Sequence, residues 1–158
     1  EDAAEVKRNW DRIKRDVEKR GEGDPSILSK VSLAMPALPR AQKLTAEAAK
    51  VGFDWGSALA VLEKGEEELA EFREALSGAN PESIRDEIGD LLFSIVNLSR
   101  HVKVNAEEAL RASNRKFEKR FLYIEERLRA QGKDPASSTL EEMDALWEEA
   151  KQKDRGRC

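Results

Sequence analysis

The segment from Ile84 to Ser99 constrains the fold of this chain more than any other, because it is apolar around most of a helical circumference. It follows Pro81, a residue that is common in the first turn of a helix. A helix that is apolar on most of its faces needs cover on several sides. The segment therefore predicts a helix buried within a helical bundle.

Composition and length agree with one helical domain. Charged residues make up 38% of the 158 residues, and Gly and Pro number only 9 and 5. Ala, Leu, Glu, Lys and Arg dominate, and these residues favour helices over strands. We predict an all-α fold.

Apolar residues at helical spacing and capping residues divide the chain into segments. Predicted helices cover 3–18, 39–51, Ser57 (or Asp54) to Leu76, Pro81 to Val102, Asn105 to Ala130, and a last segment that opens at Thr139 with a capping box to Glu142. Turn formers separate the first of these from the rest. We expect a leading helix and linker at 1–35 and a main helical domain at 36–158.

Charge and cysteine content exclude several classes of protein. The net charge of −4 provides no positive field for nucleic acid, and the single cysteine, Cys158, allows no intramolecular disulfide or cysteine-based metal cluster. No apolar run approaches the roughly 20 residues that a membrane-spanning helix needs. We therefore expect a soluble, cytoplasmic protein. The chain begins at Glu1 without a methionine, which indicates processing or a fragment of a longer protein.

Three acids gather on the predicted helix that follows Ser57. Glu67 and Glu71 are four residues apart and Glu68 and Glu71 three apart, so their carboxylates project within about one quadrant of a helix. Taken alone, this helix suggests an ordinary solvated glutamate face.

The next helix changes that interpretation, because a single polar seam runs along it. The seam consists of Glu87, Asp90, Ser94, Asn97 and His101, at spacings of three, four, three and four. Buried acids that face three further acids need a cation. Oxygen ligands without clustered His or Cys favour Mg²⁺, or Mn²⁺, over zinc. The alternative is that arginine and lysine from 105–130 neutralise these acids.

These acids and several other segments resemble the MazG family. The family's EExxE and ExxD signature is matched by Glu67, Glu68, Glu71, Glu87 and Asp90. Further similar segments are 36–43, 51–55, 89–93, 97–101 and 114–121. Trp10 and Lys14 resemble the segment that joins the two tandem domains of full-length MazG. The resemblance thus suggests the carboxy-terminal catalytic domain.

The resemblance implies an all-α nucleoside triphosphate pyrophosphohydrolase, a homodimer whose two chains share a four-helix core. It implies Mg²⁺ bound by Glu67, Glu68, Glu71, Glu87 and Asp90, and cleavage of the substrate between the α- and β-phosphates. Glu68 or Glu71 would take the proton from water. Lys64, Lys116, Arg120 and Lys151 would hold phosphates, and Trp147 would lie against base or sugar. Asn97 is a candidate to orient a metal ligand or to contact the nucleotide.

Other interpretations remain open at this point. Lys116 and Arg120 could pair with glutamates on their own helix, and Trp147 could belong to the core. The chain could be a non-catalytic helical dimerisation module, although it retains all five acids. It could also be a narrow dUTP or dCTP pyrophosphatase, but the matching segments favour broad specificity and a role in clearing the nucleotide pool.

Overall fold

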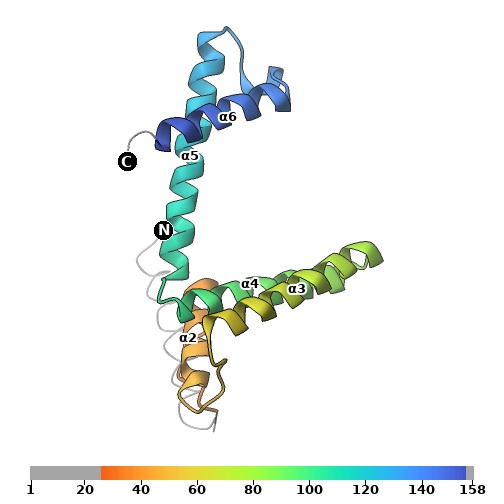
Figure 1. Ribbon diagram of the computed structural model, residues 1–158, viewed down its shortest axis with the longest axis vertical. Coiled ribbons are helices and arrows are strands. Elements are labelled where there is room, and N and C mark those ends of the chain that lie inside the picture. Colours follow the sequence, from red (N-terminus) through yellow and green to blue (C-terminus); the bar gives the residue numbers. More distant parts are fainter. Residues whose placement is uncertain (1–25, 156–158) are drawn as a thin grey trace, which may run out of the picture. The chain divides into compact units, whose positions relative to one another are not determined.

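The computed structural model describes residues 26–155, and every regular element in that range is helical (Figure 1). The elements are α2 (Ala37–Ala49), α3 (Ala58–Gly78), α4 (Pro81–His101), α5 (Ala106–Ala130), a 3-10 turn η1 (Pro135–Ser137) and α6 (Leu140–Arg155). The prediction of an all-α fold is confirmed. Over this range, no helix has the length and apolar character needed to cross a membrane. The helix predicted at 3–18 lies outside the described residues.

Capping side chains set the beginnings of three helices where the sequence predicted them. The Ser57 hydroxyl accepts a hydrogen bond from the backbone N–H three residues on, at 3.2 Å, and the Asn80 side chain accepts one from two residues on, at 3.0 Å. Thr139 and Glu142 each accept from the other's backbone N–H, at 3.2 and 3.1 Å. These contacts satisfy N–H groups that have no partner within a helix.

Helix α2 is displaced by two residues from its predicted range of 39–51. It begins at Ala37, because a proline fits within the first turn, where N–H groups have no intrahelical partner, and Pro39 lies there. It ends at Ala49, and Gly52 follows with a φ of +87°, a backbone conformation that glycine adopts readily.

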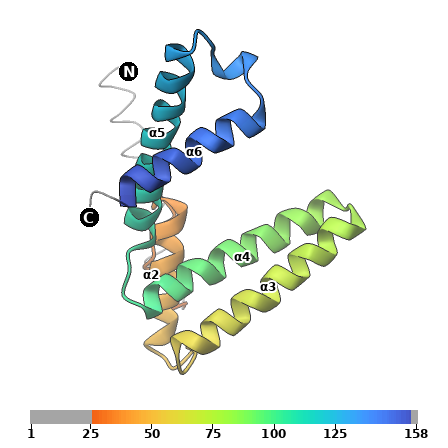
Figure 2. The same cartoon turned by 45° about the horizontal axis from the view of Figure 1, so that its top comes forward.

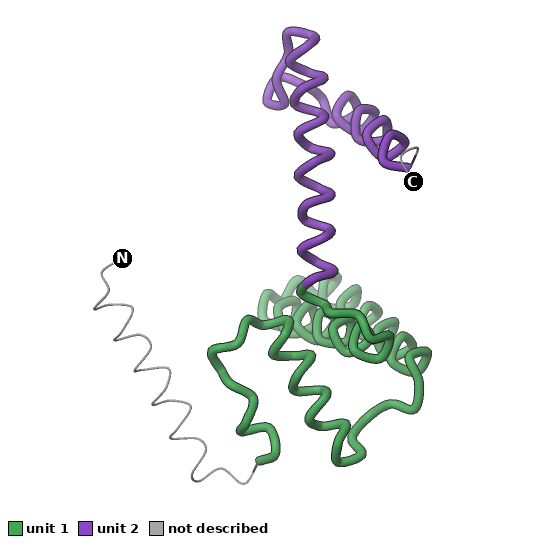
Figure 3. Tube along the Cα trace, turned by 90° about the vertical axis from the view of Figure 1, so that its left-hand side faces the viewer, with its two compact units in different colours: residues 1–107 green, residues 108–158 purple. Residues whose placement is uncertain are grey.

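The chain divides into two compact units between Glu107 and Glu108 (Figure 3). The first unit contains α2, α3 and α4, and the second contains most of α5 with α6. The boundary predicted between residues 35 and 36 stays a prediction. Within the linker predicted before it, Val31 is buried and the Lys30 ammonium lies 2.9 Å from the Glu47 carboxylate, so this segment packs against α2.

In the first unit, α3 and α4 lie side by side and antiparallel, and α2 packs against α4 (Figure 2). Only Ala79 and Asn80 join α3 to α4, and Ala79 takes a left-handed conformation with a φ of 53°. Among its described residues, 26–107, the buried apolar side chains are Val31, Val61 and Val96. The hairpin of α3 and α4 carries all five predicted metal ligands, three on α3 and two on α4.

The sequence predicted that α4 is buried on several sides. This prediction is wrong for a single chain. Ile88, Leu92, Phe93 and Ile95 are 45%, 56%, 42% and 52% exposed. Only Val96 and Asn97 are buried on this helix. The physical reason is that α2 and α3 cover only part of its circumference, and within residues 26–155 an apolar face is left exposed.

In the second unit, α6 packs on the carboxy-terminal half of α5. Ile124, Leu128 and Leu146 form its buried core, with Met143 and Trp147 against them. The earlier part of the α5 apolar stripe, at Leu110 and Phe117, stays exposed within this unit.

Candidate active site

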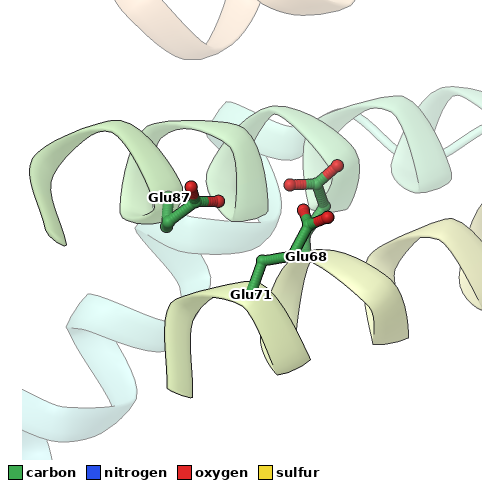
Figure 4. Close-up of side chains that lie close together, drawn as sticks. All are labelled: Glu68, Glu71 and Glu87. Atoms are coloured by element: carbon green, nitrogen blue, oxygen red, sulfur yellow. The ribbon is translucent and has the colours of Figure 1, made fainter. Parts of the chain in front are cut away.

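Three carboxylates from the α3 and α4 hairpin converge between the two helices (Figure 4). They belong to Glu68 and Glu71 on α3 and to Glu87 on α4, and one oxygen from each lies within 4.8 Å of the others. Glu68 is buried, Glu87 is half-buried and Glu71 is exposed. The helical spacing of the two α3 acids turns both toward α4, as the sequence predicted.

The charge of this cluster is only partly compensated by protein groups. Burial, and then the negative charges of Glu71, Asp90 and Glu68, raise the pKa of the Glu87 carboxyl above its usual value. On α3, the Lys64 ammonium lies 3.0 Å from Glu67 and 2.9 Å from Glu68, and these carboxylates raise the pKa of the lysine. Lys64 therefore partly neutralises the acids of α3, whereas the Glu87 carboxylate stays close to other negative charges.

The donor set fits a hard divalent cation. Magnesium binds oxygen ligands at about 2.0–2.1 Å in an octahedron, so oxygens on opposite sides of the ion lie about 4.2 Å apart. One carboxylate oxygen from each of Glu68, Glu71 and Glu87 lies within 4.8 Å of the others, which is close to this separation. Among the residues that the structure describes, three acids with one lysine leave net negative charge for a cation.

The two other predicted ligands lie beside this cluster. The Glu67 side chain is 66% exposed and bound to Lys64, and Asp90 is exposed on α4, where it contributes to the raised pKa of Glu87. Of the five predicted ligands only Glu68 is buried, so the expectation of several buried carboxylates is wrong in one chain. That Glu67 and Asp90 hold the metal stays a prediction.

Asn97 belongs to a network that the sequence analysis did not find. It is 1% exposed, and its Oδ1 accepts from Arg100 Nε at 3.0 Å. The Arg100 guanidinium also donates to both carboxylate oxygens of Asp54, and His101 Nε2 lies 2.9 Å from Asp54. These contacts fix the loop before α3 against the end of α4. Arg100 is one turn beyond Asn97, but nothing in the sequence pairs it with an acid 46 residues away.

We expect Asp54→Asn to lower the free energy of unfolding at neutral pH by about 1–2 kcal/mol, after allowance for the partial exposure of the pair. Hydrogen bonds from Arg100, and then from His101, hold the pKa of Asp54 at about 2, below its usual 3.8. A lowered acid pKa stabilises the fold above the usual pKa and ceases to do so as the pH falls through the folded value. Urea unfolding of both proteins at pH 7, 4 and 2.5 should show the difference shrinking toward pH 2. A constant difference would contradict this origin.

The remaining predicted substrate-binding residues lie in the second unit. Arg120 donates from Nε to Asp154 at 3.0 Å, and its guanidinium lies 5.5 Å from the centre of the Trp147 ring. Lys151 pairs with Glu148 of its own helix at 2.6 Å. Lys116 is exposed. Their approach to the acid cluster of the first unit stays a prediction.

Trp147 and Asp154 are the residues of α6 that contact Arg120 of α5. Trp147 packs against the core of the second unit, and its ring lies 5.3 Å from that of Phe117. Asp154 binds both Lys119 and Arg120, which together hold the pKa of its carboxyl below the usual value. Arg120 thus pairs across to α6 and not with a glutamate of its own helix. Lys119 and Asp154 were not predicted from the sequence.

Together, the fold and the acid cluster define a class: all-α proteins with a carboxylate site built on a pair of neighbouring helices. Residues 57–122 match the family model of the MazG nucleotide pyrophosphohydrolase domain. This range includes all of α3 and α4 with every predicted metal ligand. Over this range the chain is thus similar to the MazG nucleotide pyrophosphohydrolase domain.

Relatives of the chain carry matching names. Over 144 residues it is 40% identical to the nucleoside triphosphate pyrophosphohydrolase/pyrophosphatase MazG of Thermotoga maritima, covering 91% of this chain and 54% of that protein. It is 36% identical over 156 residues to the nucleoside triphosphate pyrophosphohydrolase of Escherichia coli K12, covering 98% of this chain and 59% of that protein. It is also 42% identical to the uncharacterized protein YabN of Bacillus subtilis, of which it covers 32%. The chain thus spans little more than half of the first two relatives.

Proposed function

We propose that this chain hydrolyses nucleoside triphosphates, with Mg²⁺ or Mn²⁺, to nucleoside monophosphate and pyrophosphate. The convergence of Glu68, Glu71 and Glu87 between α3 and α4 is the observation that carries this proposal. The names of the Thermotoga and E. coli relatives support it. Broad base specificity and a role in clearing the nucleotide pool are parts of the same proposal.

Each group of the site has a separate task in this reaction. A bound divalent cation neutralises the phosphates and lowers the pKa of a coordinated water. Glu67, Glu68, Glu71, Glu87 and Asp90 would hold the cation. Lys64, Lys116, Arg120 and Lys151 would bind phosphate oxygens, because cationic side chains form strong hydrogen bonds to phosphate. Lys64 already lies at the edge of the cluster.

Glu71 is the better candidate to take the proton from the attacking water. Glu68 is buried and its carboxylate is bound by Lys64. Glu71 is exposed to solvent, from which the water must come. A carboxylate within hydrogen-bond reach of that water can act as the general base.

A panel of ribo- and deoxyribonucleoside triphosphates, with products separated by chromatography, tests the reaction. We expect monophosphate and pyrophosphate from several of them with Mg²⁺, no turnover with EDTA, and recovery when Mg²⁺ or Mn²⁺ is returned. Release of inorganic phosphate and diphosphate would contradict the proposed cleavage site. Turnover of dUTP or dCTP alone would identify the narrow enzyme, and no turnover would favour the dimerisation module.

We also propose that a second copy of the chain covers the open face of the α3 and α4 hairpin and completes a four-helix core. Large apolar side chains that are at least 37% exposed follow both helices: Leu59, Leu62, Leu69, Leu76, Ile88, Leu92, Phe93 and Ile95. Burying such side chains in an interface stabilises association by roughly 1.5–3 kcal/mol for each that is fully covered. This face therefore favours a homodimer.

Leu92→Asp should convert a dimer into a monomer at micromolar concentration, because the new carboxylate would be buried without a partner. Leu92 is 56% exposed in one chain, so the substitution leaves the chain's own core intact. Sedimentation velocity measures the change. Leu140→Asp, at a position that is 73% exposed on α6, is the matched control and should leave the dimer unchanged. A monomeric parent protein would contradict the shared core.

A further inference from the structure

A cavity of about 250 Å³ in the first unit is not used by the acid cluster. Its walls are largely apolar and aromatic, and they come from α2, the loop before α3, and α4: Leu44, Ala48, Phe53, Trp55, Phe93 and Asn97. Pockets that enclose a whole drug-sized ligand measure roughly 300–1,000 Å³. This cavity is smaller, so it suits a single ring system that forms part of a larger ligand.

One wall of the cavity carries a hydrogen-bond donor without a partner. Asn97 is 1% exposed, and its Nδ2 has no hydrogen-bond partner within residues 26–155. The orientation of the amide is fixed, because Arg100 Nε can only donate and does so to Asn97 Oδ1 at 3.0 Å. A buried donor without a partner costs about 1–3 kcal/mol. The cavity thus favours a ligand that offers an acceptor.

The cavity lies along the same polar seam as the metal-binding acids. Asn97 is seven residues beyond Asp90 on α4, which places it about 10 Å farther along the helix axis. This separation is comparable to the span of a nucleotide from its α-phosphorus to its base. A ligand with phosphates at the acids can therefore reach the cavity with its ring.

We propose that this cavity binds the nucleobase of the substrate, with Asn97 Nδ2 donating to a ring nitrogen or carbonyl oxygen and with Phe53 and Trp55 packing on the ring. The inference rests on the proposed function. Phe53 is 74% exposed, so its ring can adapt to a ligand at little cost in packing. Every nucleobase has an acceptor, so this contact selects for the presence of a base and suits a broad range of bases.

Binding of monophosphates with and without a base tests the proposal without turnover. Calorimetry with the full chain and Mg²⁺ should show AMP and UMP binding at least about tenfold more tightly than ribose 5-phosphate, from one hydrogen bond and ring packing. Trp55→Ala, in the loop, and Asn97→Asp, which replaces the donor with an acceptor, should each remove most of this preference. Val51→Ala, at a position 64% exposed in the same loop, should keep it.

The outcomes separate this proposal from the proposed function. Equal binding of the base-free and base-containing ligands to the parent protein overturns the base site, even where pyrophosphate is released from triphosphates. A base-dependent preference that both variants retain also overturns it. A preference that both variants lose supports the site, even where the parent protein releases no pyrophosphate and the proposed reaction fails. Trp55→Ala keeps the test valid if Asn97→Asp does not fold.

Discussion

Replacing Glu71 with alanine should abolish pyrophosphate release, with a loss of more than about 100-fold in kcat/KM. Residues that only support a metal ligand already cost 10–100-fold when removed, and Glu71 lies in the cluster itself. It is also the candidate proton acceptor. The side chain is exposed, so its loss should leave the helical content and the unfolding midpoint close to those of the parent protein.

The matched control is Glu74→Ala, which removes the same charge from an exposed position of α3 outside the cluster. It should retain activity. Asp90→Ala provides the second comparison, because Asp90 is a predicted ligand that lies outside the three-acid cluster. Near-normal turnover by Glu71→Ala in a folded protein would contradict the proposed site. Normal turnover by Asp90→Ala alone would exclude Asp90 from the metal site.

Glu87→Gln should stabilise the metal-free protein and remove its stabilisation by Mg²⁺. The pKa of Glu87 is raised above its usual 4.5 by burial and by neighbouring acids, so its ionised form opposes folding in the absence of a cation. A raised acid pKa means that stability falls as the pH rises through the folded pKa. The amide carries no charge and avoids this loss. At pH 7 with EDTA, the variant should therefore unfold at a higher temperature than the parent protein.

With Mg²⁺ added, the parent protein should instead unfold at a higher temperature than Glu87→Gln. A ligand at 100 times its Kd stabilises the folded state by about 2.7 kcal/mol, which in a chain of this size raises Tm by about 5–10 °C. The parent protein should show this rise, whereas Glu87→Gln should show little. Thermal unfolding with EDTA and with Mg²⁺ measures both effects, and Glu74→Gln should behave as the parent protein does. An equal rise in both proteins would exclude Glu87 as a ligand.

Local features of the fold could be predicted because they depend on neighbouring residues. Ser57, Pro81 and Thr139 mark helix starts in the sequence, since capping and first-turn preferences depend only on residues a few positions away. The pairing of Glu68 with Glu71 follows from helical periodicity alone. That Glu87 faces them was expected from the polar seam of its helix, whose acids were taken to lie opposite the three acids of the preceding helix.

Features that depend on distant residues could not be predicted in this way. The Asp54 and Arg100 contact joins residues 46 positions apart, and the Lys119 and Asp154 contact joins residues 35 apart. The apolar circumference of α4 indicated that cover was needed but not whether it comes from the same chain.

The two-residue connection between α3 and α4 affects how the site forms during folding. Every predicted metal ligand lies between residues 67 and 90, on either side of Ala79 and Asn80. Contacts that are local in sequence close small loops, which form quickly and at low entropic cost. The acids can therefore come together before the longer-range contacts of the chain are made. A cation that binds at this stage would favour the hairpin over the unfolded chain, so metal supply would influence the rate of folding as well as the final stability.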